Sequence, residues 1–232
     1  MTSIVPAGRR CPKQKVRLPA HAAGFRRRLL AWYTRHRRRL PWRGVRDPYA
    51  VLVSEIMLQQ TQVARVTEFF PRFLARYPTC EALAAAPADA VRETWEGLGY
   101  YARARNLHAA AQRIVTDWGG RVPADPADLR RLPGIGRYTA GAVASLAYAA
   151  PVAAVDTNAI RVLTRVLRLR RRPGAAFLNR VWSVAGALVP RHRSADWHPA
   201  LMALGAVFLL VTIIVNIIAR WLVWRVQRQD KA

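Results

Sequence analysis

The sequence predicts an all-α fold. From about Phe25 to Val189, apolar residues recur at helical spacing in short stretches, with arginines on the other faces. Prolines separate these stretches at positions 48, 71, 78, 87, 123, 126 and 133. No stretch shows the sustained alternation of β-branched residues that is typical of a strand. With a mean helix length of about 11–12 residues, this part of the chain accommodates roughly ten helices.

The net charge of +25 indicates a polyanionic partner, which is either nucleic acid or an anionic membrane surface. The chain has 232 residues, with 38 Lys and Arg against 13 Asp and Glu. An apolar fraction of 52% excludes a disordered basic tail and allows a hydrophobic core. The two cysteines, Cys11 and Cys80, are too few for a disulfide scaffold or a four-cysteine metal or iron–sulfur site.

Both ends of the chain differ from its middle. Residues 1–22 are basic and contain prolines without periodicity, and we interpret them as a disordered arm. No apolar signal-peptide stretch follows the first arginines, so a cytoplasmic protein is expected. Residues 200–219 carry no charge and are long enough to span a bilayer core, and Trp221 and Trp224 follow among arginines. A membrane-compatible helix and a buried core helix both fit this pattern.

The first segment that indicates chemistry is SEIMLQQTQV, which extends from Ser54 to Val63. Glu55 is a lone carboxyl group in an otherwise apolar helical stretch, and burial would raise its pKa as a general acid near neutral pH requires. An exposed Glu on an amphipathic face is the alternative. The cluster Gln59, Gln60 and Thr61 that follows suits contact with base edges, although a polar helix end would look the same.

Two further segments combine aromatic rings with arginines. Trp42 and Arg43 follow a proline, and GLGYYARARN contains Tyr100, Arg103 and Arg105. Such rings can stack on bases while the guanidinium groups contact phosphates. Aromatic packing in the core beside surface charges is the alternative in both places.

The segment LPGIG, at residues 132–136, lies between two helical stretches. Gly134 and Gly136 allow a tight turn that exposes successive backbone N–H groups at a helix N-terminus, where a phosphate can bind. A simple interhelical turn is the alternative. Arg137 beside the turn and the arginines at 130 and 131 favour a clamp on the DNA backbone.

Asp156 lies in the segment VDTN, after an apolar stretch and before another helical one. The simplest interpretation is an N-cap that binds the free amides of the following helix. The alternative is a carboxylate that faces a cleft about 20 residues after the phosphate clamp.

Taken together, these segments resemble the catalytic domain of adenine DNA glycosylases of the MutY type, in the helix–hairpin–helix (endonuclease III-like) superfamily. The resemblance extends from about Phe25 to Ala206. It rests on LPW, SEIMLQQTQV, GLGYYARARNL, LPGIGRYTAG and VDTN in this order, with SADW and ALMALGA near the end. It implies a two-lobed α fold over residues 23–206, with double-stranded DNA between the lobes and an adenine, mispaired with 8-oxoguanine or guanine, rotated into a pocket.

The resemblance also implies roles for single residues. Glu55 would protonate the adenine ring, and Asp156 would stabilise the oxocarbenium sugar, a division of roles that glycoside hydrolysis also uses. Tyr138 would lie near the sugar, and Asn158 would orient water or Asp156. The predicted DNA-binding residues are Trp42, Arg43, Leu58, Gln59, Gln60, Thr61, Tyr100, Arg103, Arg105, Gly134, Gly136 and Arg137.

The sequence departs from the family's pattern in three ways. Members usually have four cysteines after the LGA segment that hold a [4Fe–4S] cluster, whereas Val207 to Leu210 follow here, so neither a metal nor a small-molecule cofactor is expected. The family's second domain, which recognises 8-oxoguanine, is not expected, and residues 207–232 are an apolar stretch with a basic tail. Ile160 replaces the Lys of some relatives, so a lyase step is not expected.

Two alternative functions remain open: a T:G or U:G mismatch glycosylase, and a catalytically silent DNA-binding remnant. The expected location is the cytoplasm, at the bacterial nucleoid.

The apolar segment at residues 200–224 predicts a membrane contact and therefore a detergent requirement. We expect the purified full chain to aggregate without detergent and to elute as one species in a mild detergent, measured by size-exclusion chromatography. A monodisperse, detergent-free preparation would show that this segment packs against protein.

Overall fold

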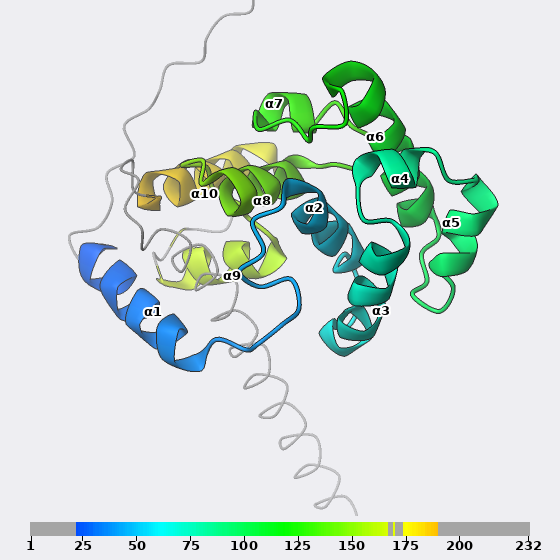
Figure 1. The fold of residues 1–232 in the computed structure, drawn as a ribbon. Helices are drawn as coiled ribbons and strands as arrows, with labels where there is room; N and C mark the ends of the chain where they lie inside the picture. The colour runs from blue at the N-terminus through cyan, green and yellow to red at the C-terminus, as the bar shows by residue number, and fades with distance from the viewer. Residues whose placement is uncertain (1–21, 167–168, 170–173, 190–232) are drawn as a thin grey trace, which may run out of the picture.

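A computed structural model describes residues 22–166, 169 and 174–189, which form helices and the turns between them (Figure 1). This confirms the predicted all-α fold, with ten helices in the described part of the chain. The predicted basic arm, apart from Ala22, and the apolar segment at 200–224 lie outside the described residues. Within the described ranges, no helix has both the length and the hydropathy needed to cross a membrane.

The helices follow one another with short connections. They are α1 (Ala22–His36), α2 (Pro48–Met57), α3 (Val63–Arg76), α4 (Cys80–Ala84), α5 (Ala88–Thr94), α6 (Ala102–Trp118), α7 (Pro126–Leu129), α8 (Arg137–Tyr148), α9 (Thr157–Val166) and α10 (Ala175–Leu188).

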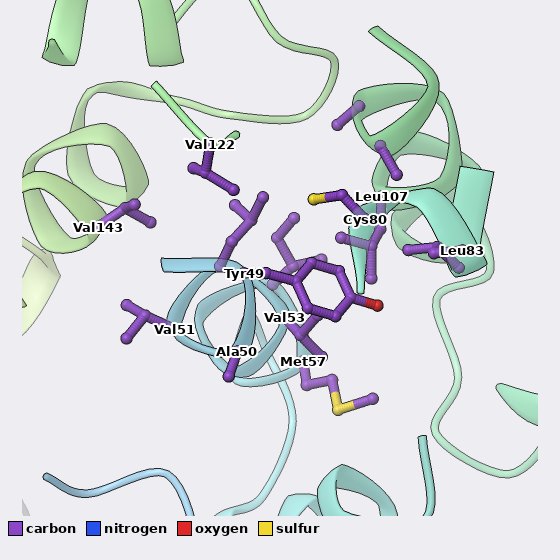
Figure 2. Close-up of a cluster of buried hydrophobic side chains, with 14 of the residues drawn as sticks. Tyr49, Ala50, Val51, Val53, Met57, Cys80, Leu83, Leu107, Val122 and Val143 are labelled. Carbon is purple, nitrogen blue, oxygen red and sulfur yellow. The ribbon is translucent and has the colours of Figure 1, made fainter. Parts of the chain in front are cut away.

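Helix α2 lies at the centre of the larger core. Every residue from Tyr49 to Met57 is buried, because α3, α6 and α8 all pack against this helix. Asp47 defines its start as an N-cap, with a side-chain oxygen 2.9 Å from the amide nitrogen of Ala50, and Pro48 occupies the first turn. Figure 2 shows apolar side chains of α2 together with Leu107 of α6 and other residues of this core.

A second, smaller core joins α9 and α10. It consists of Val155, Ala159, Val162, Leu163, Val181 and Ala185, and it is separate from the core around α2. In Figure 1, α9 and α10 lie on one side of α2, and α3, α4 and α5 lie on the other. A larger core around α2 and a separate smaller core between α9 and α10 agree with the predicted two lobes.

The segment that connects α8 to α9 runs close against α8. A Cβ atom on Gly141 would lie 2.4 Å from the carbonyl oxygen of Ala153, which is too close for any side chain. Because Ala153 precedes Asp156 by three residues, this close approach brings the start of α9 beside the helix that begins at the LPGIG turn.

We expect Gly141→Ala to destabilise the chain by about 1–3 kcal/mol, because the new methyl group would force the Ala153 backbone away from α8. Gly186→Ala is the matched control. Gly186 lies inside α10 with no atom within 4 Å of an added Cβ, so this change should stabilise the helix by roughly 0.5–1 kcal/mol. Urea unfolding followed by circular dichroism measures both; equal effects of the two variants would contradict the proposed close approach.

Candidate active site

Glu55 lies in the last turns of α2, with only 8% of its surface exposed. Burial, together with the smaller effect of the Asp156 charge, raises the pKa of its carboxyl group from 4.5 to about 7. A hydrogen bond from the Tyr138 hydroxyl acts in the opposite direction, because it favours the ionised carboxylate. Of the two interpretations from sequence, the buried acid is therefore the one observed.

Tyr138 is the second residue of α8, directly after the LPGIG turn. Its pKa is well above the ordinary value, first because of the neighbouring Glu55 charge, then through burial and the charge of Asp156. The phenol therefore stays protonated and donates its hydrogen bond to Glu55. The α2–α8 packing thus places a donor against the buried acid.

Asp156 is the N-cap of α9, as one of the two interpretations predicted. One carboxylate oxygen lies 2.6 Å from the amide nitrogen of Ala159, and the other lies 3.2 Å from the side-chain nitrogen of Asn158. This half-buried carboxylate is also close enough to Glu55 and Tyr138 to raise the pKa of both, and its position facing a cleft stays a prediction. Three elements therefore meet at one site: the end of α2, the start of α8 and the start of α9.

This arrangement combines two carboxyl groups in different environments. Glu55 is buried and exchanges a proton near neutral pH, whereas Asp156 is held by two N–H donors. A pair of this kind can protonate a leaving group on one side and stabilise a positive sugar on the other.

The turn between α7 and α8 has the geometry of a hairpin. Gly134 adopts a φ of +73°, and an added Cβ there would lie 2.7 Å from the Cβ of Asn106 in α6. Gly136 is exposed and caps α8, and it provides no side-chain hydrogen bond to the first amides of that helix. Arg137 is exposed and has its guanidinium 4.0 Å from the ring centre of Trp182 in α10. The hairpin therefore faces outward, as the phosphate clamp requires.

The residues around Gln60 and Tyr100 form two exposed loops. Both residues have left-handed backbone angles, with φ of +56° and +50°, and 61% of the Tyr100 surface is exposed. Such strain in residues other than glycine is typical of functional sites. Gln59 donates to the Thr139 hydroxyl of α8 at 3.4 Å, and Leu58 and Thr61 are half-buried beside it.

The environments of Trp42 and Arg43 agree better with the alternative of core packing than with the predicted contact with DNA. Trp42 is 7% exposed and packs edge-on against Phe70 in the core, with ring centres 5.7 Å apart. Arg43 is half-buried, with its guanidinium 5.4 Å from the ring centre of Tyr33. The prediction that Trp42 stacks on DNA bases is corrected, because its ring packs in the interior.

The prediction that Arg103 contacts DNA is also wrong. Its side chain is buried, and its terminal nitrogens bind backbone carbonyl groups. The helical period contained this information, since Arg103 shares one face of α6 with the buried residues Leu107 and Ile114. Arg105 points to solvent and stays a predicted phosphate contact.

The cysteines do not fit a [4Fe–4S] cluster, which needs four thiolates. Cys80 is buried at the start of α4, where burial raises the pKa of its thiol to about 12, and Cys11 lies outside the described residues. The described ranges also contain no group of three or more His, Cys, Asp or Glu side chains that could hold a metal ion.

The sequence of the chain is similar to those of known DNA repair proteins. Residues 53–182 match the family described as HhH-GPD superfamily base excision DNA repair protein. The adenine DNA glycosylase of Rattus norvegicus is 44% identical over 197 residues, which cover 81% of this chain and 38% of the relative. That of Mycobacterium tuberculosis (strain H37Rv) is 44% identical over 198 residues, which cover 84% of this chain and 64% of the relative. The chain therefore spans less than two thirds of the length of these relatives.

Two solved structures are similar over most of the chain. A thermostable thymine-DNA glycosylase is 31% identical with a TM-score of 0.67, over 78% of this chain and 84% of that one. Endonuclease III in a non-covalent complex with DNA is 25% identical with a TM-score of 0.65, over 79% of this chain and 83% of that one. The described all-α fold is thus similar to the folds of a thymine-DNA glycosylase and of endonuclease III.

The raised pKa of Glu55 predicts that Glu55→Gln stabilises the chain at alkaline pH. The unfolded chain loses the Glu55 proton near pH 4.5 and the folded chain near pH 7, so folding becomes less favourable as pH rises between these values. Relative to the parent, the variant should gain about 2–3 kcal/mol between pH 5 and pH 8, measured by urea unfolding. The exposed Glu93→Gln is the control and should show no such pH-dependent gain; a gain for Glu55→Gln that is equal at both pH values would contradict the buried acid.

Proposed function

Since the chain belongs to the HhH-GPD superfamily of base excision DNA repair proteins, we propose that it removes adenine mispaired with 8-oxoguanine or guanine by hydrolysing the N-glycosidic bond. The observation that most strongly supports this is the buried Glu55, with a pKa of about 7, beside Asp156. The adenine DNA glycosylases that resemble the chain, at 34–44% identity, support adenine as the base.

In this proposal, Glu55 and Asp156 act on opposite parts of the nucleotide. Protonated Glu55 donates its proton to a ring nitrogen of the extruded adenine, and the electron pair of the C1′–N9 bond leaves with the base. The sugar becomes an oxocarbenium ion, which the Asp156 carboxylate stabilises until water adds at C1′ and gives a proton to the ionised Glu55. Neutral adenine and an abasic sugar result.

Two further residues hold these carboxyl groups in place. The Tyr138 hydroxyl donates to Glu55 and keeps its pKa near neutral, where both proton release and uptake are easy. Asn158 donates to Asp156 at 3.2 Å and fixes the oxygen that would face the sugar. The two helix starts thus orient the acid and the stabilising carboxylate.

The DNA duplex would bind along the hairpin and the two exposed loops. The amides after Gly134 and Gly136, with Arg137 and Arg105, would contact phosphates. Gln60 and Tyr100 would enter the duplex beside the base that opposes the adenine, with Leu58, Gln59 and Thr61 next to it, while Arg43 would remain near the pocket.

We further propose that no metal or small-molecule cofactor takes part, because the chain supplies only two cysteines and the acid–base chemistry of Glu55 and Asp156 is sufficient. Genomic DNA as the substrate implies action at the nucleoid in the cytoplasm. A membrane contact through residues 200–224 is a separate proposal, which the detergent experiment tests.

Removal of thymine or uracil opposite guanine is the second candidate. The structural similarity to a thymine-DNA glycosylase, at 31% identity, favours it. The two candidates differ in the base that is released, so one set of duplexes distinguishes them.

We expect single-turnover release of adenine from a duplex with an A:8-oxoguanine pair, detected as strand cleavage after alkali. Glu55→Gln should slow release by about 10²–10⁴-fold because the proton donor is lost, whereas the exposed Glu93→Gln should match the parent. The parent rate should fall as pH rises above about 7, as Glu55 loses its proton.

Duplexes with A:G, T:G and U:G pairs, assayed in parallel, separate the candidates. Faster release from T:G or U:G would favour the second candidate over adenine removal. Duplex binding without release of any base would leave only the DNA-binding remnant.

A further inference from the structure

Arg103 is a buried cation to which the proposed chemistry gives no role. It lies in the first turn of α6 and is 8% exposed. Its terminal nitrogens make five hydrogen bonds, all to backbone carbonyl oxygens. Among the described residues, no carboxylate lies within ion-pairing distance of this guanidinium.

The carbonyl groups that bind Arg103 belong to two segments, the C-terminal end of α2 with the loop that follows it, and the loop before α6. One terminal nitrogen lies 3.1, 2.7 and 2.6 Å from the oxygens of Ile56, Met57 and Gln59, at the end of α2. The other lies 3.3 and 3.0 Å from those of Leu98 and Gly99. The carbonyls at a helix C-terminus have partial negative charge and lack partners within the helix, so they suit a cation.

Each of the two loops contains an exposed residue with a left-handed backbone. Gln60 follows Gln59 directly, and Tyr100 follows Gly99 directly. The guanidinium also lies 5.4 Å from the ring centre of Tyr100 and 5.6 Å from that of Trp95. Trp95 in turn donates its ring N–H to the Gly99 oxygen at 3.1 Å, which fixes the second loop from the other side.

The chemistry of this site is specific for arginine. A planar guanidinium has several donors in a fixed fork and can bridge two separate loops, whereas a lysine ammonium is a single compact point. Burial lowers the pKa of Arg103 from its ordinary value, yet an arginine stays charged at neutral pH. The positive charge thus continuously offsets the carbonyl dipoles of both loops.

We propose that Arg103 is a positioning residue that couples the Gln60 and Tyr100 loops, so that both side chains enter the DNA duplex as one unit. The inference rests on the proposed action on duplex DNA. It does not depend on which base is released, nor on the proton transfer by Glu55.

The first test measures distortion of the duplex without catalysis. All variants are made in the Glu55→Gln background, and 2-aminopurine beside the A:8-oxoguanine pair reports unstacking by a rise in fluorescence. Arg103→Lys should weaken the complex and its fluorescence rise by roughly tenfold, because one loop loses its anchor. Ile114→Val, a small loss of packing on the same helix, and the exposed Arg92→Lys should both leave the rise unchanged.

The second test separates coupling from simple loss of stability. With Gln60→Ala and Tyr100→Ala both present, Arg103→Lys should cause no further loss of the fluorescence rise, because Arg103 affects the duplex through those two side chains. A loss that is as large in this background as in the parent, or one that Ile114→Val reproduces, would overturn the proposal. An unchanged Arg103→Lys complex would overturn it as well.

A third measurement keeps Arg103 unchanged, so its result does not depend on whether Arg103 variants fold. Because the two loops act as one unit, Gln60→Ala and Tyr100→Ala should each lose nearly as much of the fluorescence rise as the double variant loses. Additive losses would overturn the coupling.

A parent chain that distorts none of the mispaired duplexes would also overturn the coupling. Distortion without release of adenine by the chain with Glu55 intact would instead contradict adenine removal and leave the role of Arg103 standing.

Discussion

The burial of one carboxyl group constrains the whole candidate site. Glu55 lies in a helix that is apolar on nearly every side, and removing a carboxylate from water is costly unless it takes up a proton or finds donors. The chain uses both solutions, since the pKa of Glu55 rises to about 7 while the Tyr138 hydroxyl donates to it. The same free-energy cost that would destabilise an ordinary core helix gives this one an acid that works near neutral pH.

The scaffold is arranged around that helix. The larger core encloses α2, and α8 brings the hairpin and Tyr138 to its side. The absent side chain of Gly141 lets the Ala153 backbone approach, which draws the start of α9 and Asp156 toward the same point. A helix N-cap and a catalytic carboxylate are therefore compatible roles for one residue, because the cap fixes the orientation of its oxygens.

The arginines divide into two classes, which differ in burial and in the groups that they can bind. Arg105 and Arg137 are exposed and suit a polyanion, in keeping with the net charge of +25. Arg103 is buried and neutralises carbonyl dipoles in place of phosphates. An aromatic and arginine-rich segment thus contains both an exposed cation that suits a polyanion and a buried cation that binds the carbonyl groups of two loops.

The sequence by itself determined the class of the fold and most of the chemical groups, because helical periodicity, prolines and short motifs are local signals. The N-cap at Asp156, the hairpin at Gly134 and the acid at Glu55 could all be predicted in this way. Only the tertiary structure decided which alternatives hold, since burial depends on residues far apart in the chain. It placed Glu55 in the interior next to Tyr138 and Asp156, and it moved Trp42 and Arg103 from the predicted DNA surface into the core. Charge and residue type were the same in every alternative; the packing of α2 against α6 and α8 determined which side chains lost contact with water.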